Sequence, residues 1–131
     1  MLKKGLFATL IALLGVFLFV AYTGLAAQEK TGGKEVTITG HVVDPACYIS
    51  MGLKGEQHKQ CAVLCAKAGQ AFGILDEKAG ILYQVLEGSP GADPNKLLWD
   101  HAESKVTVKG IVFNKNGMHA IVPTEVKPAG S

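Results

Sequence analysis

The sequence of 131 residues predicts a mainly β domain, a small barrel of five strands with a helical insert, preceded by an N-terminal hydrophobic helix. Five short stretches are rich in β-branched residues, and turn sequences containing glycine separate most of them. The segment between the first and second stretches lacks such a strand pattern, and it contains all three cysteines of the chain. The strands therefore predict the framework, and the insert is the first place to look for a functional site.

Residues 1–27 are predicted to be a signal peptide or an N-terminal membrane anchor. Lys3 and Lys4 precede an uncharged apolar run, Leu6–Leu25, and small residues suited to signal peptidase follow it. The run is also long enough to span a bilayer as a helix, and the positive-inside rule places its N-terminus in the cytoplasm. We therefore expect an exported domain, in the periplasm or on the extracytoplasmic face of the inner membrane. The membrane is a partner if the segment stays uncleaved.

Residues 28–35 are polar and are predicted to be a linker to a domain over residues 36–126. Removing Lys3 and Lys4 from the 13 basic residues of the chain leaves 11, which balance 11 acidic residues, and the chain has no arginine. Binding to a phosphate backbone relies on clustered lysine and arginine side chains. Nucleic acid is therefore not an expected partner.

The first strand is predicted over Glu35–Asp44, where apolar and polar residues alternate. Gly40 within it indicates a bend or a close approach of another backbone, as barrel strands require. Phe72–Asp76 and Ile81–Glu87 are predicted to form a hairpin. A loop rich in glycine and proline follows, and Asn95–Glu103 can form a short helix.

The insert covers residues 45–70, and a loop that contains Gly52 and Gly55 is predicted after Cys47-Tyr48. A helix is predicted over Glu56–Lys67, which has no glycine or proline and has an acidic first turn and a basic last turn. The last two strands, Lys105–Phe113 and Met118–Val126, flank an Asn-Gly turn, and residues 127–131 form a polar tail.

Five strands with a helix between the third and the fourth is the order of the OB-fold, a small Greek-key barrel. The fragments Val106–Val112 and Gly117–Pro123 resemble the last hairpin of small bacterial exported OB-fold proteins, and the resemblance covers most of residues 35–126. It implies an OB-like fold and no particular activity. Oligonucleotides, the usual OB ligands, need a basic groove with stacking aromatics, and here the aromatics are scattered among balanced charges.

Four residues of the insert are predicted to bind one metal ion: Cys47, His58, Cys61 and Cys65. The last three are spaced i, i+3, i+7 on the predicted helix and so share a face, while Cys47 can fold back onto them. Three thiols and an imidazole suit tetrahedral zinc, and also copper or iron. The Cys-x-x-x-Cys spacing is similar to the copper-binding pair of exported copper chaperones. No organic cofactor is indicated.

The predicted function is an exported or membrane-tethered metal-binding protein, with a structural, metal-delivery or accessory role in a membrane redox complex. In the alternative, Cys47 forms a disulfide with Cys61 or Cys65, and the domain is a disulfide-stapled interaction subunit of a membrane complex, without a metal. The third cysteine then remains unexplained. Catalysis has little support, because no Cys-x-x-Cys pair and no orienting group for a Cys-His pair is present.

Overall fold

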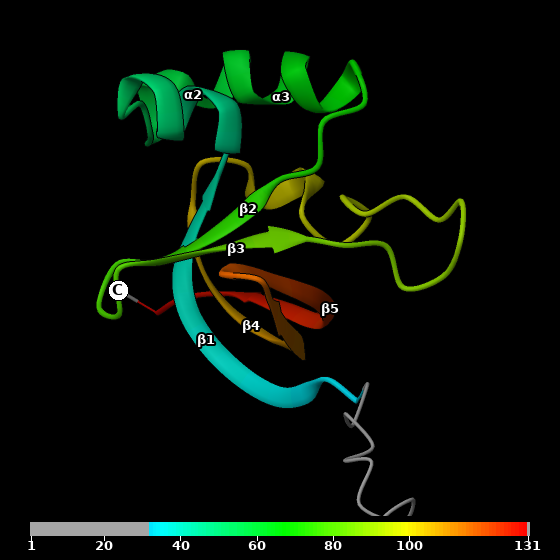
Figure 1. Cartoon of the computed structure of the whole chain (residues 1–131). Coiled ribbons are helices and arrows are strands. Elements are labelled where there is room, and N and C mark those ends of the chain that lie inside the picture. The colour runs from blue at the N-terminus through cyan, green and yellow to red at the C-terminus, as the bar shows by residue number, and fades with distance from the viewer. Residues whose placement is uncertain (1–31, 131) are drawn as a thin grey trace, which may run out of the picture. The chain divides into compact units, whose positions relative to one another are not determined.

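The computed structural model describes residues 32–130 of the chain (Figure 1). Within this range no helix has the length and apolar character needed to cross a bilayer. The predicted signal peptide or anchor, with its hydrophobic helix, lies outside the described residues, and so does the first half of the predicted linker.

Five strands close into a barrel, which confirms the strand number and the mainly β class predicted from the sequence. The strands are β1 (Lys34–Val43), β2 (Gly73–Asp76), β3 (Ile81–Val85), β4 (Lys105–Lys115) and β5 (Met118–Pro128), and their order around the barrel is β1-β2-β3-β5-β4. All neighbours are antiparallel except β3 and β5, which pair in parallel. The barrel is therefore mixed. Its last strand continues two residues beyond the boundary expected for the polar tail.

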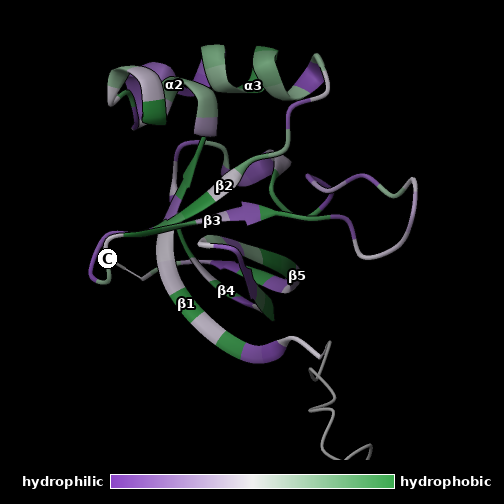
Figure 2. Ribbon diagram, viewed as in Figure 1, coloured by the Kyte–Doolittle hydropathy of each residue, from purple (hydrophilic) through white to green (hydrophobic). Residues whose placement is uncertain are grey.

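The alternation of residue types explains why these segments form strands with one face inward (Figure 2). On β4, Val106, Val108 and Val112 are buried, whereas Lys105 before them and Lys109 between them are exposed. The core also receives large side chains from the rest of the barrel and from its connections, namely Phe72, Ile74, Val85, Leu98 and Ile121. Burial of this apolar face stabilises the barrel and fixes the register of its strands.

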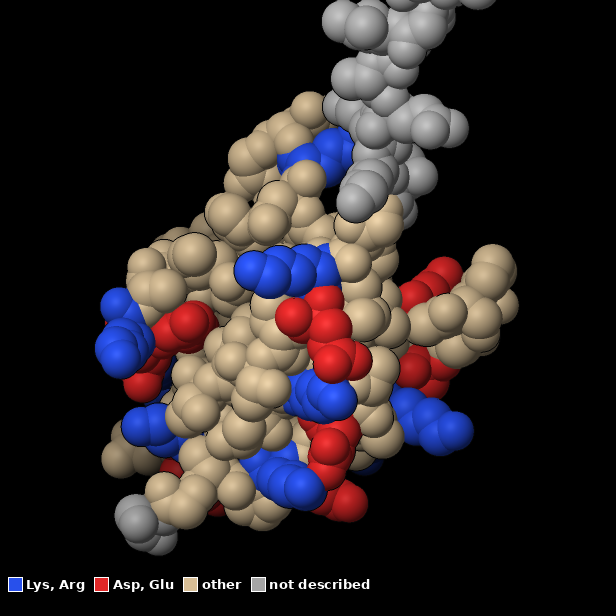
Figure 3. Space-filling view, turned by 90° about the horizontal axis from the view of Figure 1, so that it is seen from below, with Lys and Arg blue, Asp and Glu red and all other residues tan. Residues whose placement is uncertain are grey.

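The face of the barrel away from the helices carries charges of both signs (Figure 3). Lysines and acidic residues are interspersed on this face, and Lys109 on β4 pairs with Glu35 on β1 at 3.3 Å. Such exposed pairs contribute little to stability. On the face shown, charge forms no single-sign patch.

Gly40 allows β1 to approach the backbone of β2 closely. A Cβ atom at this position would lie 2.6 Å from the backbone oxygen of Leu75, and this oxygen cannot move away without disturbing β2. The close approach expected from a glycine inside a strand is thus present.

Replacing Gly40 by alanine is expected to destabilise the domain by about 1–3 kcal/mol, because the added methyl group is forced against backbone atoms. Urea unfolding followed by circular dichroism measures the change. Gly88→Ala is the matched control, since a Cβ there meets only a Val122 methyl group at an ordinary 3.6 Å. Equal stability of the Gly40→Ala variant and the unsubstituted protein would contradict the close approach of β1 to β2 at Gly40.

Two short α-helices of the insert lie together over one end of the barrel (Figure 1). They are α2 (Pro45–Met51) and α3 (Lys59–Lys67), and a 3-10 turn, η1 (Glu56–His58), precedes α3. The helix predicted over Glu56–Lys67 is therefore present, with a 3-10 first turn. Ala62 and Ala66 of α3 are buried in the barrel core, so the insert is packed on the barrel.

The helix α2 was not predicted: the sequence pattern indicated a loop from residue 49 on, and the loop begins only at Gly52, after α2. Asp44 caps this helix: its side chain accepts hydrogen bonds from the backbone N–H groups of Ala46 and Cys47. Pro45 fits the first helical position, where its missing N–H is not needed. Gly52 ends the helix in the left-handed conformation, with φ 69°.

The predicted short helix over Asn95–Glu103 is also wrong, because only the 3-10 turn η2 (Trp99–His101) forms there. The side chain of Asn95 accepts a hydrogen bond from the backbone N–H of Phe72 at 2.8 Å, which ties this loop to the start of β2. Glu103 then takes a positive φ of 56°, which a right-handed helix cannot contain. Tertiary contacts therefore outweigh the local helical pattern.

Candidate metal centre

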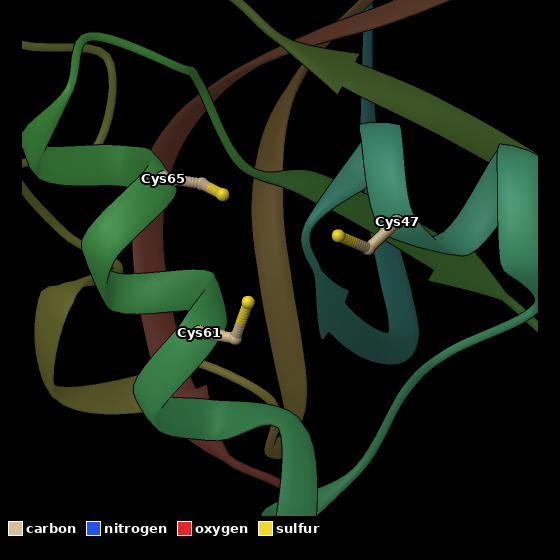
Figure 4. Close-up of side chains that lie close together, drawn as sticks. All are labelled: Cys47, Cys61 and Cys65. Carbon is tan, nitrogen blue, oxygen red and sulfur yellow. The ribbon is translucent and has the colours of Figure 1, made fainter.

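The three cysteines of the chain meet between α2 and α3 (Figure 4). Cys61 and Cys65 project from α3 toward Cys47 on α2, and the three sulfur atoms lie within 4.8 Å of one another. All three are free thiols. Cys61 is exposed, whereas Cys47 and Cys65 are half-buried, so the cluster is open to solvent on one side.

The N-terminal cap of α2 determines where Cys47 points. The Oδ1 atom of Asp44 accepts hydrogen bonds from the backbone N–H of Ala46 at 2.9 Å and of Cys47 at 3.3 Å. The same oxygen accepts a bond from the side-chain amide of Gln70, just beyond α3. One carboxylate oxygen therefore connects the start of α2 with the chain that follows α3, and so connects the two helices that carry the thiols.

A second group of donors adjoins the thiols. Asp44, Cys47 and His58 each offer one ligand atom, and these atoms also lie within 4.8 Å of one another. The two groups share Cys47. Of the four ligands predicted from the sequence, the structure thus brings the three cysteines together and places His58 beside Cys47, on the inner side of the cluster. Asp44 is a donor that the sequence analysis missed.

Two polar atoms of this inner group are buried without a nitrogen or oxygen hydrogen-bond partner among the described residues: Oδ2 of Asp44 and Nε2 of His58. Asp44 has no exposed surface and His58 keeps only 9 % of its surface exposed. A buried polar atom without a partner costs about 1–3 kcal/mol. The thiols beside Asp44 can donate to its carboxylate, whereas a cation bound at Nε2 would satisfy His58.

The thiols and the carboxylate shift each other's protonation. Burial opposes the ionisation of Asp44, but hydrogen bonds from Gln70 and from the thiols of Cys65 and Cys47 outweigh it and lower the Asp44 pKa. Burial, the hydrogen bond to Asp44 and the charge of Asp44 raise the pKa of Cys47 to about 11. The pKa of Cys65 is raised first by its hydrogen bond to Asp44 and then by burial. At neutral pH the carboxylate is therefore ionised and these two thiols are protonated.

Positive charge is scarce around these groups. Among the described residues, no lysine forms an ion pair with either of the buried carboxylates, Asp44 and Glu103. The ion pair that Glu103 makes is with His58, at 3.1 Å, and it is an ion pair only when the imidazole is protonated. Buried carboxylates normally have a cationic partner or a metal ion. The cluster is therefore chemically suited to hold a metal ion.

Comparison with known proteins gives no relative: no protein-family model, no curated protein and no solved structure matches the chain. The resemblance to small exported OB-fold proteins thus stays a prediction, and the five-stranded mixed barrel is what the structure establishes. Function must be inferred from the donor atoms of the site.

The signal that would have revealed Asp44 was present in the sequence. Asp44 directly precedes Pro45, and an aspartate followed by proline is typical of an N-cap and the first residue of a helix. The same two residues also fit the end of the predicted strand Glu35–Asp44. A helix at this place would have put Cys47 in its first turn, with the Asp44 carboxylate beside it.

Proposed function

We propose that this chain is an exported, OB-like metal-binding protein that holds one metal ion at Cys47, Cys61, Cys65 and His58. The observation that carries the proposal is that three free thiols meet beside the buried, unpartnered Nε2 atom of His58 and share Cys47 with it. The closed five-stranded barrel, with β4 paired back onto β1 and the helical insert after β1, supports the OB-like assignment.

Zinc fits the donor set best, ahead of copper and iron. Three thiolates on Zn²⁺ give a net charge of −1, and the neutral imidazole of His58 completes a tetrahedral site without changing it. The Asp44 carboxylate as fourth ligand would instead add another negative charge to the site, making the net charge −2. Cu(I) prefers sulfur donors alone, which makes the nitrogen of His58 less useful to it.

Metal delivery is the role that the exposure of the cluster favours. The proposed site has four protein ligands, as structural zinc sites do, but one of these residues, Cys61, is exposed to solvent. An incoming ligand from another protein can reach that sulfur and exchange the metal. The apolar segment within residues 1–27 would hold the domain at the extracytoplasmic face of the membrane, where a redox complex is a suitable acceptor.

Purification of the full chain from the exported fraction without chelator tests the proposal, with metal content and free thiols measured on the same sample. We expect about one metal ion per chain. His58→Ala is expected to lower the zinc affinity roughly 100-fold, because one of four ligands is lost. His119→Ala is the matched control, since His119 lies on β5 and bonds to Asn114.

Two outcomes would reject the metal site. A chain that takes up no zinc on titration and keeps one free thiol would support the disulfide-stapled interaction subunit instead. A chain that takes up no zinc and keeps three free thiols would reject both functions. In the same preparation, a zinc affinity unchanged by His58→Ala would remove His58 from the ligand set.

A further inference from the structure

Glu103 is a buried acidic residue that the proposed ligand set does not use. It lies between η2 and β4 with only 2 % of its surface exposed, and its φ of 56° falls in the left-handed region, which residues other than glycine seldom adopt. Strained residues of this kind persist where surrounding contacts hold them, and they cluster at functional sites. The contacts of the Glu103 carboxylate therefore need a physical explanation.

The carboxylate of Glu103 joins three parts of the metal centre. Its Oε1 atom accepts a hydrogen bond from the backbone N–H of Asp44 at 3.2 Å and lies 3.1 Å from Nδ1 of His58. Its Oε2 atom accepts a bond from the backbone N–H of Gly55, at the start of η1, at 2.6 Å. One side chain thus contacts the end of β1, the start of the segment leading into α3, and the imidazole.

The pair with Glu103 selects one tautomer of His58. A carboxylate has only acceptors, so Nδ1 of the neutral imidazole must carry the proton in this hydrogen bond. Nε2 is then left with its lone pair, and this is the buried atom without a partner. Metal-binding histidines are usually held in this way, with the second ring nitrogen donating to a carboxylate.

We infer that Glu103 is a positioning residue of the metal centre, which holds His58 in the Nδ1–H tautomer so that Nε2 can bind the metal. The inference rests on the proposed function. Glu103 itself does not touch the metal. A glutamine at this position has one amide N–H₂ group in place of a carboxylate oxygen. If this group faces His58, it favours the tautomer with the proton on Nε2. If it faces Gly55, it lies against the backbone N–H of that residue, which is also a donor.

A double-mutant cycle on the full chain tests this role, with Zn²⁺ affinity measured by competition with a chelator. Glu103→Gln is expected to lower the affinity about 10–100-fold, as substitutions of such outer partners do. In the His58→Ala background the same change is expected to lower it by less than about 2-fold, because Glu103 acts through the imidazole. Glu87→Gln, at an exposed position, is the control and is expected to change nothing.

The outcomes separate the inference from the proposed function. Equal losses from Glu103→Gln in both backgrounds would show a purely structural role and overturn the inference, while zinc binding itself stands. No zinc binding by the unsubstituted chain would overturn the proposed function and this inference with it.

A second measurement does not depend on the folding of the Glu103→Gln variant. Nitrogen NMR of the unsubstituted, metal-free chain reports which imidazole nitrogen of His58 carries the proton. Protonated Nδ1 with unprotonated Nε2 is expected for His58. A proton on Nε2 of the neutral ring would overturn the inference.

Discussion

Replacing Cys47 by serine is expected to weaken zinc binding roughly 100- to 1,000-fold, the largest effect of any single substitution at the site. Binding to four-ligand zinc sites yields on the order of 10–16 kcal/mol, so that one lost thiolate costs about 3–4 kcal/mol. Cys47 belongs to both donor groups, because it adjoins Cys61 and Cys65 on one side and Asp44 and His58 on the other. Its loss therefore removes the atom that the two groups share.

Chelator competition and thermal unfolding with added zinc both measure this effect. The stabilisation that zinc gives to the folded chain is expected to fall with the affinity, since a ligand stabilises only the state that binds it. Ser50→Ala is the matched control on the same helix, because Ser50 is exposed and its hydroxyl bonds only to the Ala46 carbonyl. A decrease of less than about 3-fold in the Cys47→Ser variant would exclude Cys47 as a ligand, given the ligand energies above.

Zinc affinity is expected to rise at least about 100-fold per pH unit between pH 7 and pH 8. The pKa of Cys47 is raised to about 11, and that of Cys65 is raised as well, so these two thiols carry protons in this range. Each of the three proposed thiol ligands must lose its proton to bind the metal, and each displaced proton contributes a factor of about ten per pH unit. Asp44, whose pKa is lowered, stays ionised throughout and adds no slope.

Titrations at pH 7, 7.5 and 8, corrected for the protons bound by the chelator, give the slope directly. In the Cys47→Ser variant the change in affinity per pH unit is expected to be about tenfold smaller than in the unsubstituted chain, because one displaced proton is lost with the thiol. An affinity independent of pH in the unsubstituted chain would mean that neither of the two thiolates binds zinc.

The cysteine cluster shows how far the sequence predicts the site. Cys61 and Cys65 are four residues apart on a helix, so their common face follows from helical geometry alone. His58 precedes that helix in a 3-10 turn, and its side chain is directed by its bond to Glu103, which is 45 residues away in the chain. The predicted single stripe of three donors therefore becomes two adjoining groups joined by Cys47.

Local pattern, by itself, determined the five strands, the main helix of the insert and the choice of the cysteines, because each depends on residues close together in the chain. Tertiary structure alone decided that Glu103 belongs to the centre. Glu103 reaches His58 and the backbone of Asp44 only because its strained backbone is held between η2 and β4. Such contacts depend on the packing of distant segments, and no spacing in the sequence reports them.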